Sequence, residues 1–368
     1  MKVVSEKLAE ADNRPSGFDF LRVALAISVV LVHFVPIKYG GAFTDQLFLT
    51  WRRPLVAIIL PMFFALSGFL VSGSLVRSRT IITFLGLRVI RIVPALAVEI
   101  VLSAIILGPI FTTYSLRDYF TNRLFFRYFY NIVGHVQFAL PGVFVNNPHP
   151  NVVNQQLWTI PWELQCYMLI TALALLTIVR NRVFLLTFLV AFTLVVFFLY
   201  GRQPVDGWVS VHGIILVESF IAGIVCFQFK DKIPVNKWIA LASLILSVTF
   251  LYIPRFDYFV SVPAAYLTVY LGLLNPARDR VILSGDYSYG IYLYGFPIQQ
   301  AIVGAHNNHP LALDVMYVLP LTFSVAALSW WIVERPTLGL RRYLPVIENI
   351  IMGRVMKLLP AVEKIQTQ

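Results

Sequence analysis

Apolar runs that are long enough to cross a lipid bilayer dominate this sequence. An α-helix rises 1.5 Å per residue, so about 20 apolar residues span the hydrocarbon core. Ten such runs lie at residues 18–36, 55–76, 90–111, 158–179, 183–200, 209–229, 236–253, 257–274, 287–304 and 311–333. The sequence therefore predicts an all-α, polytopic integral membrane protein with about ten transmembrane helices.

The composition agrees with a membrane protein. Of 368 residues, 58% are hydrophobic and 13% are charged, whereas a soluble domain is about 45–50% apolar and about 25% charged. The runs lack the period-two alternation of a transmembrane barrel. Cys166 and Cys226 both lie inside apolar runs and indicate core residues instead of a disulfide framework. Residues 1–16 lack the features of a signal peptide, so we expect the first apolar helix to remain in the mature protein.

The positive charges predict the orientation in the membrane. Ten spans place both termini on one side, and twenty lysines and arginines fall in the segments of that side against eight in the others. The positive-inside rule assigns that side, with both termini, to the cytoplasm. The net charge of +11 then reflects contact with anionic lipid and not with nucleic acid. We expect one transmembrane domain over residues 1–340 and a short basic cytoplasmic tail over 341–368.

Two ionisable residues share one face of the first span. Arg22 and His33 are eleven residues apart, which is three helical turns plus about 20°, or about 16 Å along the axis. Ionisable groups at membrane depth face the protein interior and default to a functional role. The alternative is that Arg22 reaches to the inner headgroups and His33 lies at the outer interface. Their common face favours a polar stripe through the protein.

Other candidates lie in later segments. Arg88 and Arg91 are one helical turn apart and suit a phosphate ligand, although a positive-inside anchor explains them equally well. Glu163 is predicted at the depth of His33 and is suited to orient that imidazole; alternatively it caps a helix start and pairs with a basic loop residue. Ser67 is suited to line a tunnel but lacks the flanks of a nucleophile elbow, and the neighbouring Gly68 indicates close helix packing.

The remaining polar features have less specific interpretations. Residues 112–157 combine aromatic and basic side chains, which indicates either an interfacial helix or one wall of an outer acceptor cleft. For Glu334 we expect a buried salt bridge with Arg22 or Arg91. The histidine and cysteine spacings indicate no metal site, and no glycine pattern for ATP or NAD is present.

Six short motifs occur in the order seen in one known family. The sequence resembles the acyltransferase-3 family, the membrane O-acyltransferases and O-acetyltransferases of bacterial surface glycans. The resemblance rests on Arg22 and His33 after Gly17-Phe-Asp-Phe, then Phe63–Leu70, Arg88–Pro94, Leu157–Glu163, Ser288–Leu293 and Glu334-Arg335-Pro336. Family members often carry a histidine where this chain has Gly295. This departure leaves His33 as the histidine embedded near the stripe, with His212 a weaker candidate. The other four, His135, His149, His306 and His309, are assigned to outer connections.

The resemblance implies a function and a set of roles. It implies transfer of an acyl group, most simply acetyl, from cytoplasmic acetyl-CoA to a carbohydrate hydroxyl outside the bacterial inner membrane. Arg22, Arg88, Arg91 and Ser67 would bind the donor, and His33 would act as general base or carry the acyl group briefly, supported by Glu163. The same stripe would also suit a secondary transporter or a flippase of a glycan or glycolipid. A non-catalytic membrane sensor or scaffold is a third interpretation.

Overall fold

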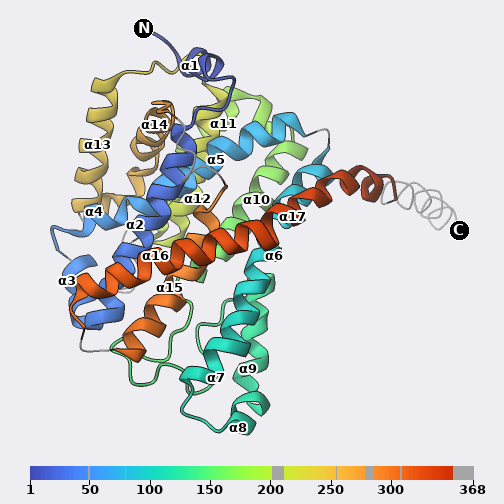
Figure 1. Cartoon of the computed structure of the whole chain (residues 1–368). Coiled ribbons are helices and arrows are strands. Elements are labelled where there is room, and N and C mark those ends of the chain that lie inside the picture. Colours follow the sequence, from blue (N-terminus) through green and yellow to red (C-terminus); the bar gives the residue numbers. More distant parts are fainter. Residues whose placement is uncertain are drawn as a thin grey trace, which may run out of the picture.

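A computed structural model of the chain describes residues 1–48, 50–78, 80–200, 211–253, 255–277, 285–306 and 309–350. Helices make up most of these residues, and the β pairing within them consists of two isolated bridges, Val3 with Pro234 and Thr112 with Val143. The all-α class is therefore confirmed (Figure 1).

The helices follow one another along the chain, mostly separated by short connections. They are α1 Val4–Glu10, α2 Gly17–Tyr39, α3 Gly41–Phe48, α4 Arg53–Ala57, α5 Ile59–Arg77, α6 Ile81–Leu102, a π-helix Ser103–Leu107, α7 Gly108–Phe111, α8 Leu116–Thr121, α9 Arg123–Tyr128, α10 Ile160–Leu175, α11 Arg182–Tyr200, α12 Gly213–Gln228, α13 Lys237–Tyr252, α14 Ser261–Gly272, α15 Ser288–Ala305, α16 Leu311–Ser329, a second π-helix Trp330–Glu334, and α17 Arg335–Leu338.

Each of the ten predicted spans contains a helix, but the helices differ in length. Within the described residues, five helical segments are long and apolar enough to cross a membrane: Gly17–Tyr39, Arg53–Arg77, Ile81–Phe111, Arg182–Tyr200 and Leu311–Ile350. Shorter apolar helices include α12 and α13. The protein is therefore a multi-pass helical membrane protein, while the ten-span arrangement and the cytoplasmic termini remain predictions.

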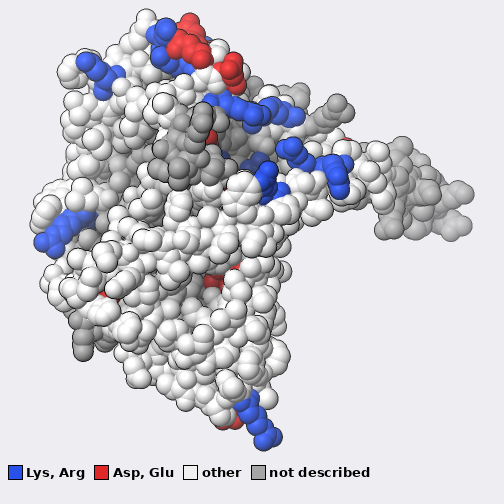
Figure 2. Space-filling view, in the orientation of Figure 1, with Lys and Arg blue, Asp and Glu red and all other residues white. Residues whose placement is uncertain are grey.

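The charges are distributed as a membrane protein requires. Figure 2 shows lysines and arginines gathered at the end of the molecule where α1 lies and along the arm that carries α17, with smaller groups near α4 and at the tip near α8, while most of the remaining visible surface is uncharged. Several residues counted in the charge bias lie outside the described residues: Arg79, Arg202, Arg278, Arg280, Arg354, Lys357 and Lys364. The structure likewise describes the predicted tail only as far as residue 350.

One helix boundary changes the setting of two candidate residues. The third span was predicted to begin at residue 90, but α6 begins at Ile81 because the Thr80 hydroxyl caps it, accepting a hydrogen bond from the Thr83 N–H at 3.2 Å. Arg88 and Arg91 therefore lie within a continuous helix and not in a connection. The predicted one-turn spacing of these two arginines is thereby fixed by regular backbone geometry.

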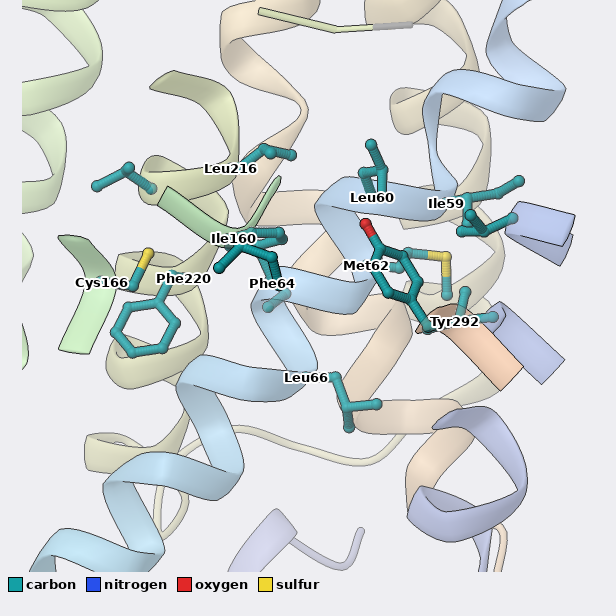
Figure 3. Packing of buried hydrophobic residues seen from close by; sticks show 14 of the residues in the cluster. Ile59, Leu60, Met62, Phe64, Leu66, Ile160, Cys166, Leu216, Phe220 and Tyr292 are labelled. Atoms are coloured by element: carbon teal, nitrogen blue, oxygen red, sulfur yellow. The ribbon is translucent and has the colours of Figure 1, made fainter. Parts of the chain in front are cut away.

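Helix α5 lies in the centre of the molecule. In Figure 3 its side chains Leu60, Phe64 and Leu66 lie among residues of other helices, including Phe220 of α12 and Tyr292 of α15. A Cβ atom at Gly68 would stand 2.0 Å from the Phe220 carbonyl oxygen. The predicted packing role of Gly68 is therefore confirmed, because only a glycine permits this approach of α5 to α12.

Helix α15 holds α2 in place along the other side of the core. A Cβ atom at Gly295 would come within 2.5 Å of Val30 Cγ2 on α2. Four residues further on, Gln299 Nε2 donates a hydrogen bond of 2.7 Å to the Val30 carbonyl oxygen. The two helices are therefore in direct contact around the middle of α2, the helix that carries the polar stripe.

The N-terminal segment closes one end of the bundle. The Val4 N–H donates to the Ile233 carbonyl at 3.0 Å, the Ser5 N–H donates to the Lys230 carbonyl at 2.8 Å, and the Val235 N–H donates to the Lys2 carbonyl at 2.9 Å. These bonds fix α1 beside the loop between α12 and α13. Side chains from both segments then line a cavity at this end.

The long connection over residues 112–157 contains two short helices, α8 and α9. Tyr119 and Phe125 are buried and pack edge to face at 5.4 Å between ring centres, and the Tyr119 hydroxyl donates to the Ala104 carbonyl at 2.7 Å. Phe126 on the same segment is exposed. An apolar, exposed side chain beside arginines fits the predicted interfacial position, which no contact in the structure tests.

Candidate active site

Both residues of the predicted polar stripe face the segment that contains α15. The Arg22 Nη1 atom lies 3.2 Å from Asp286 Oδ2, just before α15 begins. The His33 ring makes a near-perpendicular contact with Phe296 on α15, with ring centres 5.1 Å apart. Arg22 and His33 thus share one helix and one neighbouring element, as their spacing on α2 requires.

Asp286 is the functional candidate that the sequence analysis missed. Its Oδ2 atom accepts from Arg91 Nη2 at 2.6 Å as well as from Arg22, and Ser288 Oγ donates to its Oδ1 atom at 2.7 Å. Burial alone would raise the pKa of this carboxyl, but the two guanidinium groups outweigh burial and hold the pKa well below its usual value. Asp286 escaped notice because it lies one residue outside the predicted span, although it closely precedes the Ser288–Leu293 motif.

The predicted salt bridge of Glu334 with Arg22 or Arg91 is not formed among the described residues. Arg22 and Arg91 both pair with Asp286. Glu334 accepts a hydrogen bond of 3.2 Å from Ser329 Oγ, and Ser329 in turn accepts one of 3.3 Å from the Tyr294 hydroxyl. The reason is local geometry: the π-helix at Trp330–Glu334 widens the backbone and turns Glu334 back toward its own helix.

A cavity of about 80 Å³ brings five of the six predicted site residues together. We call it the arginine cavity; its lining includes Arg22, Ser67, Arg88, Arg91 and Glu163. These side chains come from four helices, α2, α5, α6 and α10. The sequence predicted each of them separately, and the fold places them around one space.

Within the arginine cavity the polar groups are only partly paired. Arg88 Nη2 donates to Ser74 Oγ at 2.7 Å, and its guanidinium lies 5.9 Å from the centre of the Tyr167 ring. The Arg88 Nε atom is buried and has no hydrogen-bond partner within the described residues. A buried donor without a partner is costly, so Arg88 is suited to bind an acceptor atom of a ligand.

Glu163 lines the arginine cavity, where its hydrogen-bonding partner is Tyr167. Its Oε1 atom accepts a hydrogen bond of 2.5 Å from the Tyr167 hydroxyl, one helical turn further along α10. The described part of the chain contains no hydrogen bond between Glu163 and His33, and His33 is not among the residues that line this cavity. The predicted similar depth of the two residues did not make them neighbours.

A second, larger cavity adjoins the first. We call it the basic cavity; its volume is about 570 Å³, and Arg14, Arg77 and Lys230 line it together with Asp19. Arg22 and Leu70 line both cavities. The basic cavity is bounded by the N-terminal segment, at the strongly charged end seen in Figure 2. The two cavities therefore lie side by side, and basic side chains line both of them.

Two further acids are buried away from these cavities. Glu99 Oε1 accepts from Ser103 Oγ at 2.7 Å and from Asn154 Nδ2 at 2.8 Å. Glu218 Oε1 accepts from the Thr193 hydroxyl at 2.5 Å. In the described residues the Oε2 atom of each acid is buried without a hydrogen-bond partner, but neither acid lines the arginine cavity or the basic cavity. Within the described residues no group of three or more metal-ligating side chains is present.

The helical membrane bundle thus encloses a buried, arginine-lined cavity, with an imidazole on the same helix as one of the arginines. The model of the acyltransferase-3 family, described as "Acyltransferase domain", matches residues 16–334. That match covers most of the sequence, so the chain belongs to the acyltransferase-3 family and is an acyltransferase.

Two curated relatives align over nearly their whole length. The chain is 24% identical over 341 residues to the "O-acetyl transferase" of Shigella phage Sf6, covering 88% of this chain and 96% of the relative. It is 26% identical over 363 residues to "Nodulation protein 10" of Rhizobium leguminosarum bv. viciae, covering 89% and 94%. No solved structure matches the chain.

Proposed function

We propose that this protein is an O-acetyltransferase of the bacterial inner membrane. It takes an acetyl group from cytoplasmic acetyl-CoA and transfers it to a hydroxyl of a carbohydrate on the outer side. The observation that carries the proposal is the arginine cavity, which Arg22, Arg88 and Arg91 line and which shares Arg22 and Leu70 with the basic cavity at the charged end. The family and the relative named O-acetyl transferase support an O-acyl product.

The donor would enter through the basic cavity. Coenzyme A carries several phosphate charges at one end and a neutral thioester arm at the other. Arg14, Arg77 and Lys230 suit the phosphates, since guanidinium and ammonium groups bind phosphate well. The arm would pass Arg22 into the arginine cavity, whose wall includes Ser67 and the unpaired Arg88 Nε atom. A carbonyl oxygen of the arm would satisfy that donor.

Arg91 and Glu163 would shape the donor end. Asp286 already balances the charge of Arg91, so Arg91 contributes a fixed, oriented guanidinium rather than a free cation. Glu163 places a carboxylate among three arginines. Its negative charge would weaken the nonspecific binding of other anions in this cavity. Its influence on His33 would pass through the bound donor, because no hydrogen bond joins the two residues in the described chain.

His33 would perform the transfer beyond the arginine cavity, on the same helix as Arg22. A half-buried imidazole can remove a proton from the acceptor hydroxyl or attack the thioester itself. Both roles place the reacting carbon between Arg22 and His33 on the face of α2 that meets α15.

The test is acetyl transfer in sealed vesicles that contain the purified protein in one orientation. Radiolabelled acetyl-CoA is supplied on the side of the N-terminus or on the other side, with a methyl glycoside as the probe acceptor on the opposite side. We expect labelled glycoside only when acetyl-CoA is on the N-terminal side, and we expect His33→Gln to abolish it. Transfer that persists in His33→Gln would refute the role of His33. Uptake of the glycoside without release of coenzyme A would favour the transporter alternative.

A further inference from the structure

The loop over residues 146–155 folds back onto α15 instead of standing free in the outer connection. Asn147 Nδ2 donates to Gln300 Oε1 at 2.7 Å and to the Gln300 carbonyl at 3.0 Å. Gln300 Nε2 donates to the carbonyls of His149 at 2.9 Å and Val152 at 2.7 Å. Four hydrogen bonds thus join one buried glutamine of α15 to three residues of the loop.

This attachment brings a second imidazole next to the His33 site. His149 is 4% exposed, and its ring makes a near-perpendicular contact with Phe296, with ring centres 6.0 Å apart. The His33 ring contacts the same Phe296 ring at 5.1 Å. Two histidines that are far apart in the sequence therefore meet around one aromatic side chain, close to the place where α15 contacts α2.

The tautomer and the protonation state of the His149 imidazole suit a general base. Its Nε2 atom lies 2.8 Å from Gln155 Oε1. An amide oxygen only accepts hydrogen bonds, so Nε2 carries the hydrogen and the ring's lone pair lies on Nδ1. Burial lowers the pKa of His149, and the bond to Gln155 only partly opposes this. The neutral ring, which is the form able to accept a proton, therefore predominates at neutral pH.

Acyl transfer by way of His33 requires a second general base. If His33 carries the acetyl group, its nitrogen is blocked and cannot also remove a proton from the acceptor. A second base must then lie within reach. Glu163 is bound to Tyr167 in the arginine cavity, and Glu99 is enclosed by Ser103 and Asn154. His149, in contact with the same ring as His33, is the better placed group.

Resting on the proposed function, we propose that His149 is a second catalytic residue, the general base that activates the acceptor hydroxyl while His33 carries the acetyl group. Both rings contact Phe296, and Gln155 fixes the tautomer of His149, a positioning role. The substrate that His149 would touch is the alcohol and not the thioester.

The two half-reactions balance. In the first, a His33 ring nitrogen attacks the thioester carbon, a C–N bond forms and the C–S bond breaks. The sulfur leaves with the electron pair and recombines with the ring proton of His33 as the free thiol. In the second, the acceptor oxygen attacks the acetyl carbon while His149 Nδ1 takes the hydroxyl proton. A C–O bond forms, the C–N bond breaks, and His149 returns the proton to the departing nitrogen of His33.

The test separates the half-reactions in the purified full-length protein. Release of coenzyme A from acetyl-CoA is followed in a single turnover, and the acetyl-enzyme is then offered either a methyl glycoside or hydroxylamine. Hydroxylamine attacks acyl-imidazoles without a base. For His149→Gln we expect unchanged coenzyme A release, a roughly 10²–10⁴-fold slower transfer to the glycoside, and an unchanged rate of acetohydroxamate formation.

Two further variants keep the result decisive. His135→Gln changes an exposed histidine of the same outer connection and should leave all three rates unaltered. Gln155→Leu retains the imidazole but removes its tautomer partner, and it should slow only the glycoside step, about tenfold. It carries the test if His149→Gln fails to fold.

The possible outcomes distinguish the two proposals. If the wild-type protein releases no coenzyme A and transfers no acetyl group, the proposed function and this inference both fall. If the wild-type protein is active but His149→Gln slows coenzyme A release or hydroxamate formation as much as glycoside transfer, the role of His149 as base is overturned. If both His149→Gln and Gln155→Leu transfer acetyl to the glycoside at the wild-type rate, the role of His149 as base is also overturned. The proposed function is unaffected by that result.

Discussion

Asp286 pairs with two arginines that line the arginine cavity, so its removal is a direct test of that site. The Asp286→Asn variant keeps the side-chain volume but leaves Arg22 and Arg91 without their shared carboxylate. We expect a loss of about 1–3 kcal/mol in the free energy of unfolding, the cost of removing hydrogen bonds to charged groups. We also expect at least a roughly tenfold fall in kcat for acetyl transfer, because the guanidinium groups lose their fixed orientation.

The matched control for Asp286 is another aspartate that pairs with an arginine. Asp231 pairs with Arg182 at 2.8 Å, but both side chains are largely exposed, and such surface pairs contribute little. Asp231→Asn should therefore change neither unfolding in a denaturant titration nor kcat. Equal effects of the two substitutions would mean that Asp286 has no special role at the cavity.

At the scale of helices, the contact between α5 and α12 depends on the absence of a side chain at Gly68. In a Gly68→Ala variant the new methyl group would stand 2.0 Å from the Phe220 carbonyl oxygen, which is backbone and cannot rotate away. We expect a loss of about 1–3 kcal/mol from overpacking. Because Ser67 and Phe220 both line the arginine cavity, we also expect a raised KM for acetyl-CoA, measured in the same preparation.

Gly339 provides the comparison for this prediction. A Cβ atom there would meet nothing within 4 Å, and alanine has a higher helix propensity than glycine. Gly339→Ala should therefore leave both stability and KM intact. If Gly68→Ala behaved in the same way, α5 and α12 would not be in close backbone contact.

The helices and the pairings between them differ in how far a sequence can predict them. Hydropathy is a local property, so it located a helix in each of the ten ranges. Helix ends were predicted less accurately. The third span was predicted to begin at residue 90, but α6 begins at Ile81, where Thr80 caps it. The ion pair of Arg22 with Asp286 joins residues 264 positions apart, and a single sequence contains no signal for such a pairing.

The candidate site shows the same division. Helical spacing correctly placed Arg22 and His33 on one face and Arg88 one turn from Arg91. Depth along the membrane normal was inferred for Glu163 and His33, but depth does not determine which way each helix is rotated. Glu163 therefore faces Tyr167 and the arginines, and the neighbour of His33 is Phe296, a residue that only the packing of α15 on α2 reveals.

For the whole molecule, the number of membrane crossings determines where the two termini lie. Ten spans place both termini on one side, whereas the five long helical segments alone would place them on opposite sides. The charge bias gives the orientation only once ten spans are assumed. Cysteine labelling can decide, because both native cysteines, Cys166 and Cys226, are buried.

We predict the pattern of labelling by a membrane-impermeant maleimide in sealed vesicles. Lys2→Cys and Arg342→Cys replace exposed residues near the two ends of the described chain, and Arg117→Cys replaces an exposed residue on α8. With ten spans, the reagent on one side labels the first two variants together and the third only from the opposite side. Labelling of Lys2→Cys and Arg342→Cys from opposite sides would mean an odd number of crossings. It would also remove the argument that the basic cavity beside α1 opens toward cytoplasmic acetyl-CoA, since the charge bias that assigns that side assumes an even number.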